Sequence, residues 1–76
     1  MNIQRIILEN LRRRHPGLQP TNALWSECLL DEPQATYTAY KAALTELEQL
    51  GEIVVIAGAD RTKAKITDAG LARLAE

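Results

Sequence analysis

Apolar residues in the first part of the chain recur every three or four positions, which is the spacing of amphipathic helices. The first such segment follows Asn2, whose side chain can cap a helix. It is expected to end near residue 14, because Pro16 disfavours helical geometry at the residue before it. A second, shorter helix is expected to begin at a cap formed by Thr21 or Asn22 and to end at Asp31-Glu32-Pro33.

The pattern of apolar positions changes at Gly51. Before it, a longer apolar stripe predicts a third helix over residues 34–50, and glycine suits the left-handed geometry that often follows a helix. After it, residues 52–57 are mostly β-branched and have the length of a strand. Residues 58–61 supply a turn, and residues 62–66 alternate between apolar and charged side chains. Residues 52–66 therefore predict a two-stranded hairpin with one solvated face.

The last ten residues predict a short helix that is capped by Thr67 or Asp68 and uses Leu71 and Leu74 as its apolar contacts. No internal repeat, linker or low-complexity segment divides the sequence, so residues 1–76 are expected to form a single domain. The predicted order is helix, helix, helix, strand, strand, helix. This order indicates an α+β fold.

Two runs of residues carry a resemblance to a known family. Residues 43–54 resemble the end of a recognition helix that passes into the first strand of a wing. Together with Asp60-Arg61 and residues 66–74, they follow the pattern L-x-x-L-G-x-I, then R, then L/I-T-x-x-G-x-x-x-L of MarR- and PadR-type bacterial transcriptional regulators. The resemblance covers essentially the whole chain. It implies a winged helix-turn-helix domain, with three helices, a small two-stranded β-hairpin wing and a short C-terminal helix.

The net charge of −1 and the pI of about 5.8 give no overall attraction to nucleic acid. The distribution of charge is more informative. Residues 1–15 carry four arginines and one glutamate, residues 16–60 carry one lysine and seven acids, and residues 61–76 carry four bases and two acids. A basic surface can therefore form locally if the fold brings the two ends of the chain together.

The resemblance implies that the third helix enters the major groove of double-stranded DNA. Its N-terminus and exposed face offer polar or cationic side chains and no acid before Glu46, as base-edge and phosphate contacts require. The candidate contacts on this helix are Thr36, Tyr37, Thr38, Lys41 and Thr45. The alternative interpretation is a solvated helix face without a ligand.

Two further groups of cations are candidate DNA contacts. Arg61, Lys63 and Lys65 would suit a wing that lies over the minor groove or the flanking backbone. Alternatively, these charges protect an edge strand from pairing. Arg13 and Arg14 end the first helix, where they either complement its dipole or contact a phosphate.

The second helix has more apolar surface than one inward face can hide. Trp25 and Leu29 are the candidate interface residues on it. A homodimer is expected, because one small module rarely supplies enough affinity and a dimer reads two half-sites. The alternative function is a winged-helix module that binds a protein partner through the apolar surface around this helix.

No catalytic chemistry is predicted. The only histidine, His15, and the only cysteine, Cys28, lie 13 positions apart, and no phosphate-binding glycine loop or paired carboxylates accompany them. We expect no enzyme activity, cofactor, metal or small-molecule substrate. No apolar run approaches the roughly 18 residues of a membrane span, and no secretion signal is evident, so we expect a cytoplasmic protein with no membrane partner. The leading interpretation is a small DNA-binding transcriptional regulator.

Overall fold

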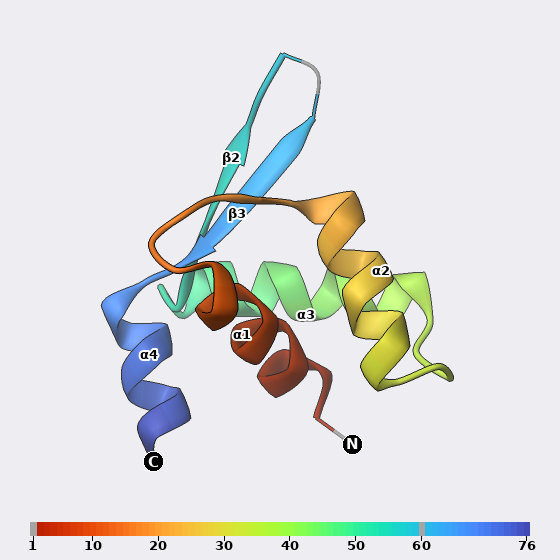
Figure 1. Cartoon of the computed structure of the whole chain (residues 1–76), viewed down its shortest axis with the longest axis horizontal. Helices are drawn as coiled ribbons and strands as arrows, with labels where there is room; N and C mark the ends of the chain where they lie inside the picture. The colour runs from red at the N-terminus through yellow and green to blue at the C-terminus, as the bar shows by residue number, and fades with distance from the viewer. Residues whose placement is uncertain (1, 60) are drawn as a thin grey trace.

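The computed structural model describes residues 2–59 and 61–76, and these residues form an α+β fold with four helices and a three-stranded antiparallel sheet (Figure 1). The α+β class predicted from the sequence is therefore confirmed. In chain order, the elements are α1 (Ile3–Arg14), β1 (Gln19–Pro20), α2 (Thr21–Asp31), α3 (Tyr37–Gln49), β2 (Ile53–Ala57), β3 (Thr62–Ile66) and α4 (Asp68–Ala75).

Side-chain caps begin three of the four helices in the described residues. The Asn2 side chain accepts hydrogen bonds from two backbone N–H groups at the start of α1, as predicted. Thr67 caps α4 in the same way by accepting from the Gly70 N–H at 3.3 Å. Thr36 caps α3 by accepting from the Ala39 N–H at 3.1 Å, so this helix begins later than residue 34.

The predicted cap of α2 is wrong. Thr21 is already the first residue of the helix, Pro20 occupies the cap position, and no side chain caps the helix there. The Thr21 hydroxyl instead donates to the carbonyl of Thr62 at 3.3 Å, across to strand β3. A proline can stand at this boundary because its missing N–H would find no partner in the first turn of a helix.

The sheet has the order β1-β3-β2, and its shortest strand was not predicted. In β1, Gln19 lies opposite Ala64 and Pro20 lies opposite Lys63. The strand β3 is therefore central in the sheet. The interpretation that Lys63 and Lys65 protect an edge is wrong for this reason.

The turn between β2 and β3 includes Asp60, which lies outside the described residues. The hairpin closes with the Gly58 N–H donating to the Arg61 carbonyl at 2.9 Å. At the other end of β2, Gly51 has a φ of 74°, the left-handed geometry that the sequence predicts after a helix.

The hydrophobic core lies between the helices and the inward face of the hairpin. Tyr40, Leu44 and Leu47 of α3 are buried against apolar side chains of every other helix and of both hairpin strands. The buried partners are Ile7, Leu8, Leu11, Leu24, Cys28, Ile53, Ala64, Ile66 and Leu74. The alternation of β3 is confirmed, since Ala64 is buried while Lys63 and Lys65 are exposed.

A polar network holds the base of the hairpin against three helices. The Arg73 guanidinium of α4 contacts the Glu52 carboxylate at 2.6 Å and donates to the Gln4 side chain of α1 at 2.9 Å. Gln4 in turn donates to the Glu46 carboxylate of α3. The hairpin projects beyond the helices from this fixed base (Figure 1). In the described part of the chain, no helix is long and apolar enough to cross a membrane.

Candidate nucleic-acid interface

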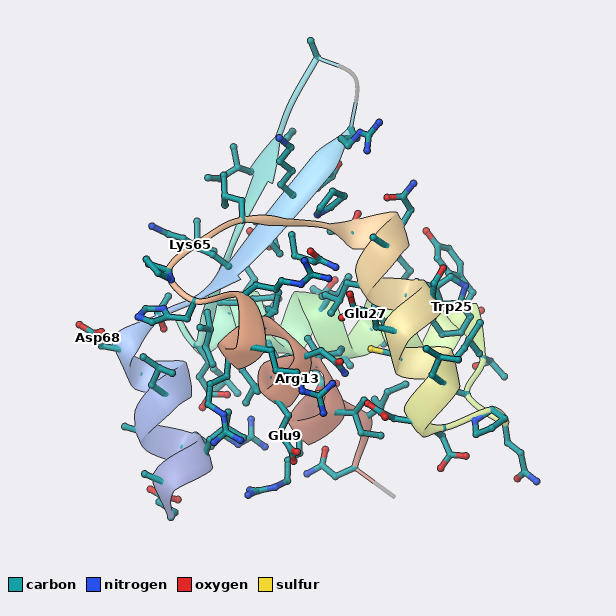
Figure 2. The ribbon with its side chains drawn as sticks, in the orientation of Figure 1. Glu9, Arg13, Trp25, Glu27, Lys65 and Asp68 are labelled. Atoms are coloured by element: carbon teal, nitrogen blue, oxygen red, sulfur yellow. The ribbon has the colours of Figure 1, made fainter. Side chains whose placement is uncertain are left out.

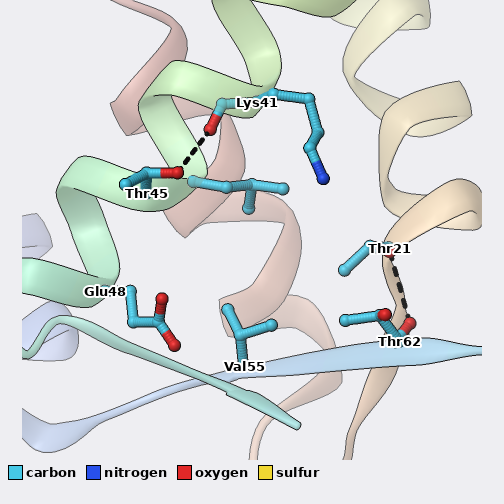
Figure 3. A pocket seen from close by; sticks show the side chains of 7 residues that line it. Thr21, Lys41, Thr45, Glu48, Val55 and Thr62 are labelled. Carbon is cyan, nitrogen blue, oxygen red and sulfur yellow. Dashed lines mark hydrogen bonds between the residues drawn. The ribbon is translucent and has the colours of Figure 1, made fainter. Parts of the chain in front are cut away.

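The exposed face of α3 borders a groove between this helix and the hairpin (Figure 3). Lys41 and Thr45 line the groove from α3, and Thr62 and Val55 line it from the hairpin. The remaining lining residues are Thr21, Leu44 and Glu48. The fold therefore brings two of the candidate DNA contacts together with the inward face of the hairpin.

Lys41 keeps its charge available in this groove. None of the ion pairs formed by the described residues involves it. Its Nζ atom lies 6.0 Å from the centroid of the Tyr37 ring, at the outer limit of a cation–π contact. The hydroxyl of Thr45 donates to the Lys41 carbonyl at 3.1 Å, so this threonine offers its oxygen lone pairs to a ligand while its proton is engaged.

An acid on this face was missed in the sequence. Glu48 follows Lys41 and Thr45 at helical spacing and lines the same groove, where Figure 3 shows its carboxylate beside the hairpin. Glu46, by contrast, lies on the other side of α3, since its carboxylate accepts a hydrogen bond from Gln4 of α1. The sequence contained the signal for this position. Thr45 follows Lys41 by four residues and Glu48 follows Thr45 by three, which places the three side chains on one face of a helix.

The first turn of α3 is held by a cluster of three aromatic rings. Trp25 contacts Tyr37 edge-on, with ring centroids 5.6 Å apart, and Tyr40 at 5.0 Å. The Tyr40 hydroxyl donates to the Thr21 carbonyl at 2.6 Å, and burial raises the pKa of this phenol. These contacts fix the N-terminal half of α3 against α2.

The candidate interface residues on α2 are only partly available. Trp25 is half-buried because it packs against the two tyrosines of α3, and Leu29 is also half-buried (Figure 2). The exposed apolar side chain on this helix is Leu30, at 83% of its full exposure. Cys28 lies inside the core, where burial, and after it the charges of Asp31 and Glu27, raise its pKa to about 12.

The three candidate cations of the hairpin are all exposed, but they do not all face the groove. Arg61 and Lys63 border a shallow hollow at the tip of the hairpin, together with Gly58 and Ala59. Because side chains alternate along a strand, Lys63 and Lys65 lie on the sheet face opposite Thr62. The groove and the lysines thus occupy opposite faces of the hairpin.

Arg13 and Arg14 are exposed at the C-terminal end of α1, and each contacts a polar side chain. Arg14 pairs with the Glu27 carboxylate at 2.9 Å, and Arg13 donates to the side chain of Asn10 at 3.0 Å. Asn10 itself donates to Asp31 at 3.0 Å. The structure thus gives Arg14 a role in joining α1 to α2, connects Arg13 to α2 only through Asn10, and has neither arginine in the lining of the groove.

No protein-family model, curated protein or solved structure matches the chain.

Proposed function

We propose that this protein is a small DNA-binding transcriptional regulator with a winged helix-turn-helix architecture. In this proposal α2 and α3 form the helix-turn-helix, α3 is the recognition helix, and the β2–β3 hairpin is the wing. The observation that carries the proposal is the exposed face of α3. This face presents Thr38, Thr45 and Lys41, a lysine that takes part in none of the ion pairs of the described residues, and it borders the groove beneath the hairpin.

In the major groove, Thr38 and Lys41 would reach base edges, because the N-terminal residues of a recognition helix lie deepest. Thr36 and Tyr37 stand at the helix N-terminus, where backbone N–H groups and the helix dipole favour a phosphate. Thr45 lies one turn further along and would contact the backbone. The aromatic cluster around Trp25 supports this arrangement, since it packs the first turn of α3 against α2.

The wing would supply the second set of contacts. Arg61 lies in the turn of the hairpin, which projects beyond the helices (Figure 1), and an arginine in this place suits the negative potential of a narrow minor groove. Lys63 and Lys65 face away from the α3 groove, so their contacts would be with flanking phosphates. Arg13 and Arg14 would be structural in this proposal.

Titration of isotope-labelled protein with a mixed-sequence duplex at about 50 mM salt tests the proposal, because non-specific binding has a Kd of about 10⁻⁴ to 10⁻⁶ M. Amide shifts confined to residues 36–45 and to the hairpin would support it. The variants Lys41→Ala and Arg61→Ala should each reduce the salt slope by about one unit. Arg5→Ala removes the same charge from α1 and serves as the matched control. The proposal is overturned if no duplex shifts any amide, or if Arg5→Ala weakens binding as much as the other two.

A substitution of Glu48 should change the affinity for DNA in the opposite direction. Its carboxylate lies on the groove side of α3 and would repel a phosphate backbone there. Glu48→Gln should therefore tighten DNA binding by about two- to fivefold, the size expected of an exposed charge interaction of about 0.5–1 kcal/mol. An unchanged affinity would show that DNA does not approach this end of α3.

A protein-interaction module is the second candidate function. The observation that favours it is Leu30, an apolar side chain on α2 that is exposed to 83% of its full area and so is available to a partner. A partner that binds there should shift amides of α2 and leave those of α3 and the hairpin unchanged.

A further inference from the structure

The outer edge of the sheet is formed by strand β2, which pairs only with β3. The hydrogen bonds at the two ends of the hairpin show which way its backbone groups point. The Gly58 N–H donates to the Arg61 carbonyl, and the Thr67 N–H donates to the Glu52 carbonyl. Because hydrogen-bonded pairs alternate along an antiparallel ladder, Val54 and Ile56 direct their backbone groups toward β3.

The backbone groups of Ile53, Val55 and Ala57 therefore point away from the sheet. Among the described residues, no hydrogen bond outside the helices and strands involves these three residues. An unpaired row of this kind is a template for another strand, unless charge, proline or a bulge blocks it. The strand β2 contains none of these features, since its sequence is Ile-Val-Val-Ile-Ala, and its register with β3 has no bulge.

The side chains on this edge are also apolar and accessible. Val54 and Ile56 are exposed to 39% and 44% of their full area, on the sheet face opposite the core. Both lie on a β-branched strand of high β-propensity. The nearest cations on the same face, Lys63 and Lys65, belong to the central strand β3 and so stand one strand away from the edge.

We propose that this edge is a self-association surface, on which β2 of a second copy pairs antiparallel with β2 about a two-fold axis at Val55. In this register Val55 lies opposite itself, and Ile53 lies opposite Ala57 of the second copy. The three outward-pointing residues of each strand would then form six backbone hydrogen bonds. The two three-stranded sheets would become one continuous sheet of six strands.

A second copy fits this edge because the strand is self-complementary. Val54 and Ile56 flank Val55 on either side. In the dimer Val54 of each copy would therefore lie opposite Ile56 of the other copy, and the four side chains would form one apolar cluster. Charge does not oppose the pairing. The lysines of the two copies lie on strands three spacings apart, about 14 Å, which exceeds the Debye length of about 10 Å at 0.1 M salt.

The association should be weak. A single pair of five-residue strands buries less than the roughly 1,200 Å² of a standard interface, so a Kd in the micromolar to millimolar range is expected. The inference does not depend on DNA binding, and it is tested without nucleic acid.

Sedimentation of the whole chain from about 10 µM to about 1 mM, with amide shifts recorded over the same range, tests the proposal. The expected result is a monomer–dimer equilibrium in which the amides of Ile53, Val55 and Ala57 shift with concentration. Ile56→Lys should weaken it at least tenfold, because it places two lysines beside the two-fold axis. The matched control is Leu30→Lys, which makes the same change at the exposed position on α2 and should leave association unchanged.

A chain that stays monomeric up to about 1 mM would overturn the proposal, as would association that Leu30→Lys abolishes and Ile56→Lys leaves intact. If Ile56→Lys does not fold, the unmodified chain still decides the question. Concentration-dependent shifts must then fall on the β2 edge, and shifts confined to α2 would refute the proposal.

Discussion

Gly70 lies in the first turn of α4, where this helix crosses the base of the hairpin. A Cβ added there would meet the backbone carbonyl oxygen of Glu52 and would lie 2.6 Å from Cγ1 of Ile66. The glycine thus allows α4 to approach β2 and β3 closely enough for Thr67 and Arg73 to bond with the Gly51–Glu52 segment. Gly70→Ala is therefore expected to destabilise the fold.

Two effects of opposite sign decide the magnitude. Alanine is the better helix former, by up to about 1 kcal/mol, so helix propensity alone predicts a gain in stability. Overpacking a buried site typically costs about 1–3 kcal/mol, and the carbonyl of Glu52 cannot rotate away as a side chain could. Because the closest contact is to backbone, the overpacking cost is expected at the upper end of this range, about 3 kcal/mol, which leaves a net loss of about 2 kcal/mol. In a chain of this size such a loss lowers the Tm by about 8–16 °C and removes a large share of a stability of about 4–11 kcal/mol.

Urea unfolding followed by the fluorescence of Trp25, the only tryptophan, measures this loss. The control is Ala72→Gly, at an exposed position of the same helix, which isolates the propensity effect and should cost about 1 kcal/mol. The reasoning is refuted if Gly70→Ala is as stable as the original chain while Ala72→Gly loses stability as expected.

Three further changes have definite expected results. Gly51→Ala should cost about 1–2 kcal/mol in thermal unfolding, and Gly51→Asn less, because the φ of 74° strains a side chain although no atom lies near the added Cβ. Tyr40→Phe should cost about 1 kcal/mol in urea unfolding, since it removes the hydrogen bond to the Thr21 carbonyl; an equal stability would show that this bond contributes nothing. Stability should also fall between about pH 9 and about pH 12. Burial raises the pKa of Cys28 from 9.0 to about 12, so the stabilising effect of its protonated form is complete below the unfolded pKa and is lost as the pH rises. The pKa of Tyr40 is raised as well, so the fall should be shallower, but still present, in Cys28→Ala.

Local chemistry explains why much of the fold could be predicted. Asn2 and Thr67 each satisfy free N–H groups at a helix start, and Gly51 takes up a geometry that other residues resist. The alternation of β3 follows directly from the burial of one sheet face. These signals act within a few residues, so the sequence alone contains them.

The features that could not be predicted depend on contacts between distant residues. The strand β1 has only two residues, one of them a proline, and it exists because Gln19 and Pro20 lie beside β3. That pairing makes β3 central and β2 an edge, which rules out the alternative role of the lysines as protection of an edge strand. Similarly, the ion pair between Arg14 and Glu27 joins two different helices, so it depends on the packing of α1 against α2 and not on a local sequence pattern.

The proposed β2 dimer is geometrically compatible with the proposed α3 contacts to DNA, although it places Lys63 and Lys65 on the opposite side of the sheet from α3. A two-fold axis perpendicular to an antiparallel sheet keeps each face of the sheet on its own side. The inward faces of both copies, with Val55 and Thr62, would therefore lie on the same side of the six-stranded sheet. Both α3 helices would accompany them, since each borders the groove on that face. A dimer built through β2 would thus present both α3 helices to one side with two-fold symmetry, as the proposed reading of a palindromic DNA site requires. The edge of β2 is made of backbone groups and the α3 face of side chains, so a change such as Ile56→Lys can remove the dimer and leave Lys41 and Thr45 unaltered.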